Sequence, residues 1–325
     1  MVCVIESSTV QRFSLMKQKE NPIFELIYVL DAEYAWMYVP SKQYRRSREA
    51  LMKPKYSFFG FPRTSPKNTT EKTIAIVGSI STSKSIHPTY GQEKATSILR
   101  KLSREYDTHN MYCEVILDDF DIVDLGDFGG SDLSSAVKMV LDRGGRVIVV
   151  GGDHTTTYYS LKEIVLPQIS ILDAHLDSED YTEAFHHGCV VRRIIEEKKD
   201  VHVKIVGFRG FSTICSEYEY LQKHNAEIIP WPVENTMLSE IIAQSMFTSI
   251  DLDFFDPTSF PAVRVPEVFG ADFSGFVHLI HGIKKTKLRY IDIVEYAPSI
   301  DIGYVCGKKL IQLLLELLAL FARSV

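Results

Sequence analysis

The feature that most constrains the fold is a series of short, continuously apolar segments. One of them, Val147-Ile148-Val149-Val150, has no polar residue at alternate positions, as required of a strand that helices cover on both faces. Such segments recur with stretches of helical character between them, an order typical of parallel sheets built from βα units. We therefore predict an α/β fold, a three-layer α/β/α sandwich with a mostly parallel sheet of roughly eight strands. The predicted strands are 73–77, 113–117, 146–150, 168–172, 203–206, 227–229, 246–250 and 288–294.

The intervening segments predict helices, and the N-terminal region stands apart from them. Helices are expected at 92–105, 131–143, 155–165, 216–224 and 274–284, with a closing helix from 307 to about 323. Residues 1–56 do not follow the βα order, because they combine aromatic side chains such as Trp36 and Tyr38 with a basic run at 42–48. We predict an N-terminal extension of uncertain structure over residues 1–56, followed by one α/β domain over residues 57–325.

Composition and charge argue against several classes of function. A hydrophobic content of 45% and a charged content of 24% are typical of a globular chain. No apolar run reaches the roughly 18 residues that a membrane span needs, and the N-terminus lacks the order of a secretory signal. The net charge of −6 disfavours nucleic acid, and the five scattered cysteines form no CxxC pair. We expect a cytoplasmic protein that binds neither nucleic acids nor membranes.

Acidic and histidine residues gather where three of the predicted strands end. Asp153 and His154 follow strand 146–150, Asp173, His175 and Asp177 follow strand 168–172, and Asp251 and Asp253 follow strand 246–250. Ligands bind at this end of the strands in open parallel sheets, and residues i, i+2 and i+4 of an extended segment point the same way. So many ionisable groups at buried strand ends would repel one another and be poorly solvated unless cations neutralise them.

We therefore predict a metal site. Carboxylates outnumber imidazoles and no thiolate takes part, which favours a harder cation such as Mn²⁺ over a structural zinc. Six ligands exceed the need of one ion that keeps a water position open, whereas two ions that share carboxylates would use them all. One such cluster alone is usually a helix cap or a satisfied polar group, but three at equivalent strand ends favour two Mn²⁺ ions per subunit. The predicted ligands are His154, Asp173, His175, Asp177, Asp251 and Asp253.

Two further residues have alternative interpretations. His187 lies 10 residues beyond Asp177, in a segment with little helix or strand signal. It could relay protons or orient a substrate, or it could be an exposed loop histidine. Glu295 follows strand 288–294 at the same sheet edge, where it is either a substrate-binding carboxylate or a helix-capping acid.

Taken together, these segments resemble the ureohydrolase family of arginases, agmatinases and formiminoglutamases, whose signatures are similar to GGDH, DAHxD and SxDxDxxDP. Here the signatures read GGDH at 151–154, DAHLD at 173–177 and SIDLDFFDP at 249–257. All three are complete and in the family's order, and weaker similarity runs from about residue 59 to the C-terminus. The resemblance implies a binuclear manganese centre, with one ion bound by His154, Asp173, Asp177 and Asp251, and the other by Asp173, His175, Asp251 and Asp253.

The resemblance also implies roles in hydrolysis. Glu295 matches the acid that engages the substrate guanidinium, and His187 matches the histidine of the family's HG-containing loop. Asp177 would orient the attacking nucleophile, and His187 or Asp253 would pass a proton to the leaving amine. The implied catalytic residues are thus Asp177, His187, Asp253 and Glu295. Homo-trimers or hexamers are implied as well.

The expected substrate is a small cationic guanidino compound. Arginases hold the amino-acid head group with a longer loop that contains asparagine and serine, whereas residues 178–185 here read SEDYTEAF. The shorter spacing resembles agmatinases, and an acidic loop suits a substrate with a terminal amine and no carboxylate. Agmatine, cleaved to putrescine and urea, is the first choice, with Glu183, His187 and Glu295 as substrate-binding residues.

Other substrates and functions stay open at this point. Residues 261–267, which include Arg264, replace a glycine-rich family segment, and the loop at 79–90 also departs from the family pattern. The alternatives are an arginase, a formiminoglutamase or another guanidino-acid hydrolase, and a non-catalytic family member. A deacetylase on a similar sheet would bind one zinc and would have no need for both His154 and Asp253.

Overall fold

The computed structural model describes residues 2–7, 10–15, 26–27, 56–83, 89–110, 114–180, 184–198, 200–210 and 215–324. The chain divides into two compact units, Met1–Lys53 and Pro54–Val325. The first unit contains a three-stranded antiparallel sheet of β1 (Val2–Ser7), β2 (Val10–Leu15) and β3 (Leu26–Ile27). The predicted domain boundary at residue 56 stays a prediction.

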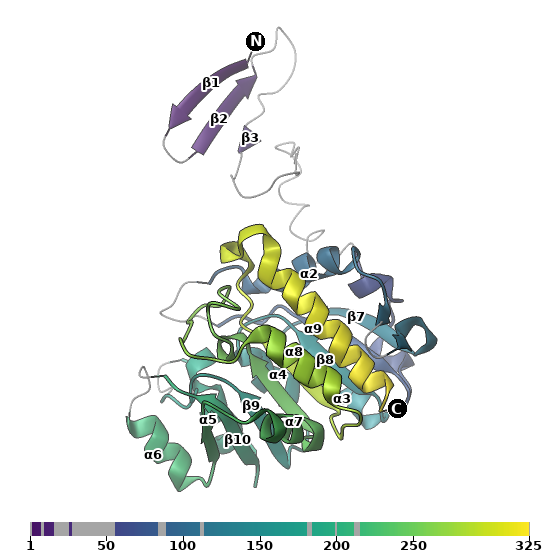
Figure 1. Cartoon of the computed structure of the whole chain (residues 1–325), viewed down its shortest axis with the longest axis vertical. Helices are drawn as coiled ribbons and strands as arrows, with labels where there is room; N and C mark the ends of the chain where they lie inside the picture. The colour runs from purple at the N-terminus through teal and green to yellow at the C-terminus, as the bar shows by residue number, and fades with distance from the viewer. Residues whose placement is uncertain are drawn as a thin grey trace. The chain divides into compact units, whose positions relative to one another are not determined.

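The second unit is built around an eight-stranded sheet (Figure 1). The strand order is β11-β10-β9-β12-β13-β8-β4-β7, and the pairing between neighbours is parallel throughout. The α/β prediction is therefore confirmed. The strands are β4 (Ile74–Ser79), β7 (Ile122–Phe128), β8 (Arg146–Val150), β9 (Gln168–Leu172), β10 (His202–Phe208), β11 (Glu227–Pro230), β12 (Phe247–Asp251) and β13 (Tyr290–Val294).

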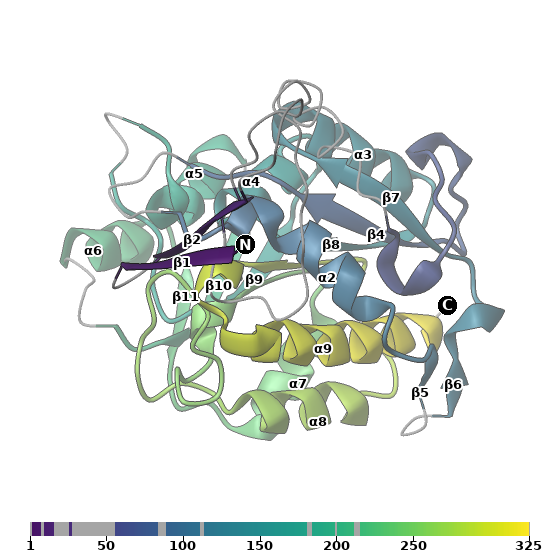
Figure 2. The same ribbon diagram turned by 90° about the horizontal axis from the view of Figure 1, so that it is seen from above.

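Alternate residues of the central strands face two separate cores. Ile148 and Val150 of β8 belong to one core, and Val147 and Val149 to the other. The first core includes α2 (Ala95–Ser103), α7 (Asn235–Gln244), α8 (Phe273–Gly282) and α9 (Val305–Ala322). The second includes α3 (Gly130–Asp142), α4 (Thr155–Leu161), α5 (Val190–Glu197) and α6 (Cys215–Lys223). Figure 2 shows the sheet between helices on both sides, so the three-layer sandwich is confirmed.

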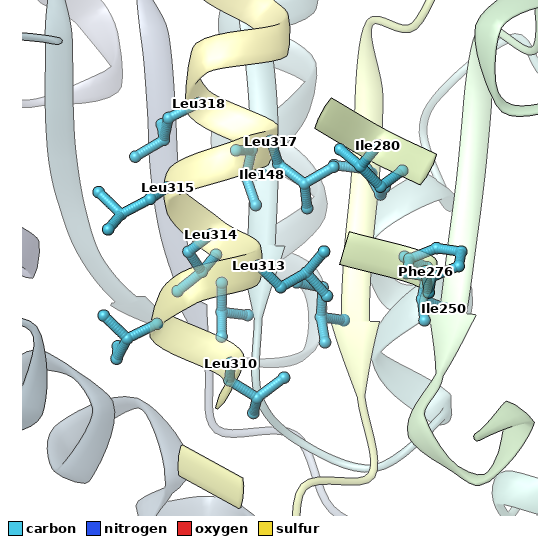
Figure 3. Packing of buried hydrophobic residues seen from close by; sticks show 14 of the residues in the cluster. Ile148, Ile250, Phe276, Ile280, Leu310, Leu313, Leu314, Leu315, Leu317 and Leu318 are labelled. Atoms are coloured by element: carbon cyan, nitrogen blue, oxygen red, sulfur yellow. The ribbon is translucent and has the colours of Figure 1, made fainter. Parts of the chain in front are cut away.

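The C-terminal helix α9 packs its apolar face into the first core. Leu313 and Leu317 are fully buried and lie near Ile148 of β8 and near Phe276 and Ile280 of α8 (Figure 3). Burying a leucine side chain contributes about 1.5–3 kcal/mol, so this helix is a major stabilising element. Within the described part of the chain, no helix is both long enough and apolar enough to cross a membrane.

One predicted strand is wrong. The described residues of the predicted strand 113–117 do not enter the main sheet: β6 (Val115–Ile116) pairs with β5 (His109–Asn110) in a separate antiparallel ribbon. The strand that sequence patterning misses is β7, at one edge of the main sheet, because Asp124 and Asp127 interrupt it. Arg100 pairs with both carboxylates, with Nε 2.7 Å from Asp124 Oδ2 and Nη1 2.5 Å from Asp127 Oδ1. This pairing allows a buried carboxylate inside a strand.

The sequence patterns also do not predict two of the helices, α5 and α7.

Candidate metal centre and active site

The six predicted ligands lie together at the carboxyl ends of neighbouring strands. Asp173 follows β9, Asp251 ends the adjacent β12, and His154 is the residue directly before α4, just beyond β8. Asp253 lies in the short 3-10 helix η6 (Leu252–Phe254) directly after β12. Segments that are distant in the sequence therefore meet at one edge of the sheet, where open parallel sheets bind their ligands.

A glycine turn brings His154 to this edge. Gly151 and Gly152 have φ angles of 92° and 78°, in the left-handed region that other residues seldom adopt. A Cβ atom on Gly152 would lie 2.7 Å from the backbone oxygen of Ser81, so the close approach excludes any side chain there. The chain can therefore turn at once from β8 into α4, and His154 lies beside the neighbouring strand ends.

Three carboxylates surround Nδ1 of His154. This nitrogen lies 2.8 Å from Oδ2 of Asp177, 3.2 Å from Oδ2 of Asp251 and 3.3 Å from Oδ2 of Asp173. The four residues form one group whose potential ligand atoms all lie within 4.8 Å of one another. His154 Nδ1 and Asp173 Oδ2 are buried and make no hydrogen bond to any described residue. Buried polar atoms without partners are costly, and a cation between them would satisfy both.

A second group overlaps the first. Asp173, His175 and Asp253 also place potential ligand atoms within 4.8 Å of one another, and Nδ1 of His175 is 3.0 Å from Oδ2 of Asp253. Asp173 belongs to both groups, as expected of a bridging ligand. Asp251 belongs to the first group only, and its Oδ1 accepts a hydrogen bond from the amide of Asp253. The bridging role of Asp251 therefore stays a prediction.

Burial and crowding shift the pKa values of these residues. Burial, reinforced by Asp173, raises the pKa of Asp177 to about 7. Burial and neighbouring carboxylates likewise raise the pKa of Asp251 and of Asp253. Burial alone would lower the pKa of His154 and of His175, but the nearby aspartates outweigh it and raise both. Without a cation, then, several of these groups share protons, and this donor set fits a pair of divalent cations.

Glu295 lies next to the metal-ligand groups. Its Oε1 accepts a 2.9 Å hydrogen bond from the amide of His154, and its Oε2 accepts one of 3.2 Å from Nε2 of Gln92. Burial, together with the charge of Asp153, raises its pKa to about 7. His187, in the 3-10 helix η5 (His187–Cys189), places Nδ1 3.9 Å from Oε1 of Glu295. The structure thus brings both residues to the predicted site.

Two site residues adopt an uncommon backbone conformation. Asp177 and Glu295 have φ angles of 44° and 68°, in the left-handed region. Non-glycine residues are strained there, and such strain concentrates at functional sites. The fold therefore holds both carboxylates in directions that relaxed backbones would not give.

The structure also clarifies residues that sequence reasoning left open or missed. Asp153 is not among the metal-ligand groups, and its carboxylate accepts hydrogen bonds from the amides of Ser83 and Thr155. Glu183, predicted to bind substrate, lies outside the described residues. Gln92, which donates to Glu295, is not found by sequence reasoning, because it is remote from Glu295 in the sequence and stands apart from the acidic and histidine clusters.

Arg209, which follows β10, ties down the loop that carries Asp253. Its Nη2 donates to the backbone oxygens of Asp253, at 2.7 Å, and Glu267, at 2.8 Å. Its Nε donates to the backbone oxygen of Val268, at 2.9 Å. The loop after β12 is thereby tied to the end of β10.

The parallel sheet and the overlapping ligand groups at its carboxyl edge define an arginase-type α/β protein with a candidate binuclear metal site. Residues 72–319 match the model of the arginase family, and the chain belongs to that family.

Named relatives show the same relationship at low identity. Human mitochondrial guanidino acid hydrolase is 26% identical over 206 residues, which cover 57% of this chain and 58% of the human protein. Agmatinase from Blochmanniella floridana is 26% identical over 184 residues, which cover 53% of this chain and 59% of the relative. The chain thus spans less than two thirds of the length of either relative. The structure of proclavaminate amidino hydrolase from Streptomyces clavuligerus superposes with a TM-score of 0.72 at 20% identity, covering 83% of this chain and 98% of that one.

Proposed function

We propose that this protein is a binuclear manganese hydrolase that cleaves a guanidino compound to urea and an amine. The observation that carries the proposal is the overlap of two ligand groups at Asp173, next to the buried carboxylate of Glu295. Four aspartates and two histidines are the ligand types that suit Mn²⁺. Membership of the arginase family supports the same class of reaction.

The metal ions would be held by His154, Asp173, Asp177 and Asp251 on one side and by Asp173, His175 and Asp253 on the other. Divalent cations held there would lower the pKa of water and so supply hydroxide near neutral pH.

The chain's own residues bind the substrate and move protons. Glu295 is the proposed anchor of the substrate guanidinium, since it is a buried carboxylate at the edge of the ligand groups. Asp177 accepts a proton and orients the nucleophile. His187 lies 3.9 Å from Glu295, within reach of a leaving amine bound between them, and it or Asp253 donates the proton that the amine needs.

We propose agmatine as the substrate, with putrescine and urea as products. The acidic sequence of residues 178–185 supports a ligand with a terminal amine. Agmatinase from Blochmanniella floridana is among the relatives of this chain, as is a guanidino acid hydrolase. The predicted contact of Glu183 with the amine belongs to this proposal, as does assembly into homo-trimers or hexamers.

The test is an assay of urea release by purified, Mn²⁺-loaded protein on agmatine, arginine and guanidinobutyrate, with release of formamide followed for formiminoglutamate. We expect turnover to be highest with agmatine. Preference for another compound would overturn the substrate proposal, and failure on all four would overturn the hydrolase proposal.

A further inference from the structure

The backbone that carries Arg264 is paired with the residues next to Glu295. Val263 forms an antiparallel bridge with Tyr296, and the amide of Ala297 donates a 2.9 Å hydrogen bond to the oxygen of Ala262. The segment that carries Arg264 is therefore paired with the residues that directly follow Glu295. This pairing fixes the backbone of Arg264 close to Glu295.

The guanidinium of Arg264 lies against two buried carboxylates. Its Nε is 3.6 Å from Oε2 of Glu295, and its Nη2 is 3.9 Å from Oδ2 of Asp153. The side chain is only 1% exposed. None of its three guanidinium nitrogens makes a hydrogen bond within the part of the chain that the structure describes. The contact between Arg264 and the two carboxylates is thus electrostatic. A cationic ligand could replace Arg264 in it.

The charges around Arg264 argue against a role for this residue in binding an anionic group of the substrate. Glu295 and Asp153 already place two carboxylates beside one guanidinium. A substrate carboxylate would add a third negative group to the same buried space, where like charges repel strongly. A cation, in contrast, would compete with Arg264 for Glu295.

We propose that Arg264 is an internal occupant of the guanidinium position at Glu295. The inference rests on the proposed function, in which Glu295 anchors the guanidinium of the substrate. A cationic substrate can then bind at Glu295 only when the Arg264 side chain moves away, because the Arg264 guanidinium already occupies the space beside Oε2 of Glu295. Arg264 is accordingly a specificity-determining residue that weakens the binding of guanidino compounds.

The test is to compare the binding of methylguanidinium to Mn²⁺-loaded wild type, Arg264→Ala and Arg264→Lys by calorimetry. We expect Arg264→Ala to bind at least tenfold more tightly than wild type, because the position at Glu295 is vacated. Arg264→Lys keeps the competing charge and should stay close to wild type. Arg264→Gln, which keeps most of the side-chain volume without the charge, should also bind more tightly and serves if the alanine variant does not fold.

A matched control removes an arginine at the other end of the sheet. Arg146 donates hydrogen bonds to the backbone oxygens of Leu288 and Ser324, away from the ligand groups. Arg146→Ala should lower stability without tightening the binding of methylguanidinium. If Arg146→Ala bound methylguanidinium as tightly as Arg264→Ala does, the tighter binding would come from a general loss of protein rigidity, and the inference would be overturned.

Two readouts separate this inference from the proposed function. Tighter binding of methylguanidinium by Arg264→Ala with no urea release from any variant supports occlusion by Arg264 and contradicts the hydrolase. Urea release from agmatine with the same KM in wild type and Arg264→Ala supports the hydrolase and contradicts occlusion. Weaker binding of guanidinobutyrate by Arg264→Ala than by wild type would show that Arg264 recognises a carboxylate, and would overturn the inference.

Discussion

Ser249 donates a hydrogen bond of 2.6 Å from its hydroxyl to Oδ1 of Asp292. The same hydroxyl oxygen lies 3.2 Å from Nε2 of His154. Because the serine proton is committed to Asp292, its oxygen accepts the proton of Nε2, and Nδ1 of His154 is the nitrogen that faces the aspartates and would bind a metal ion. Partners of this kind orient a metal-binding imidazole and fix its tautomer.

Replacing Ser249 should therefore weaken metal binding without removing a ligand. We expect Ser249→Ala to lower the affinity for Mn²⁺ by about 10–100-fold, the usual cost of losing such a partner. Calorimetric titration of Mn²⁺ measures it. Thr248→Val is the matched control, since this buried hydroxyl has no hydrogen-bond partner among the described residues. Equal affinities in both variants would contradict the role of Ser249.

Removing Asp253 should empty one of the two metal positions. Its Oδ2 lies 3.0 Å from Nδ1 of His175, and a group of three ligands that loses one binds a divalent ion poorly. We expect bound Mn²⁺ to fall from two ions to one per chain in Asp253→Ala, with an unchanged circular dichroism spectrum because the residue lies beyond a strand end. Elemental analysis measures the ratio, with the exposed Asp142→Ala as control. Two ions in Asp253→Ala would contradict the ligand assignment.

Metal-free protein should lose stability as pH rises from about 5 to 8. The folded pKa values of Asp177 and Glu295 are about 7, above the ordinary carboxyl values of about 4 in an unfolded chain. Between those values the folded state binds more protons, so the free energy of unfolding falls with rising pH. The raised pKa of His175 acts in the same direction above about 6.5.

Urea unfolding at pH 5 and pH 8, after chelation and after reloading with Mn²⁺, tests this dependence. The loaded protein should not show the loss, since Mn²⁺ binds the deprotonated ligands. Asp177→Asn should reduce the dependence in the metal-free protein. Greater stability of the metal-free wild type at pH 8 than at pH 5 would contradict the pKa assignments.

Arg209 should stabilise the loop that carries Asp253. Lysine cannot reproduce the fork of hydrogen bonds to the backbone oxygens of Asp253, Glu267 and Val268. We expect Arg209→Lys to lower the free energy of unfolding by about 1–3 kcal/mol and to speed hydrogen exchange over residues 253–268. The exposed Arg143→Lys is the control. Unchanged exchange in that loop would show that Arg209 does not hold it.

Sequence reasoning could predict which side chains meet at the sheet edge because their spacing matches the geometry of strand ends. Asp173, His175 and Asp177 follow an unmistakable apolar strand, and the structure brings Asp173 into both ligand groups. In contrast, β7 was missed because it contains Asp124, and only the fold reveals that Arg100 neutralises this residue. The local pattern of polar and apolar residues does not show that a distant residue such as Arg100 pairs with Asp124.

Dependence on tertiary contacts also explains why the surroundings of Glu295 could not be predicted. Arg264 was recognised as a departure from the family pattern, but its position against Glu295 depends on the pairing of Val263 with Tyr296. Gln92 reaches Glu295 across more than half of the chain. Residues that act through tertiary contacts alone leave no periodic signal in a sequence.

The most direct test of the account is a crystal of Mn²⁺-loaded protein measured at the manganese absorption edge. We expect two anomalous peaks at the carboxyl edge of the sheet, one in contact with His154 and the other with His175, and both in contact with Asp173. A single peak, peaks elsewhere, or side chains turned away from one another would contradict the binuclear centre.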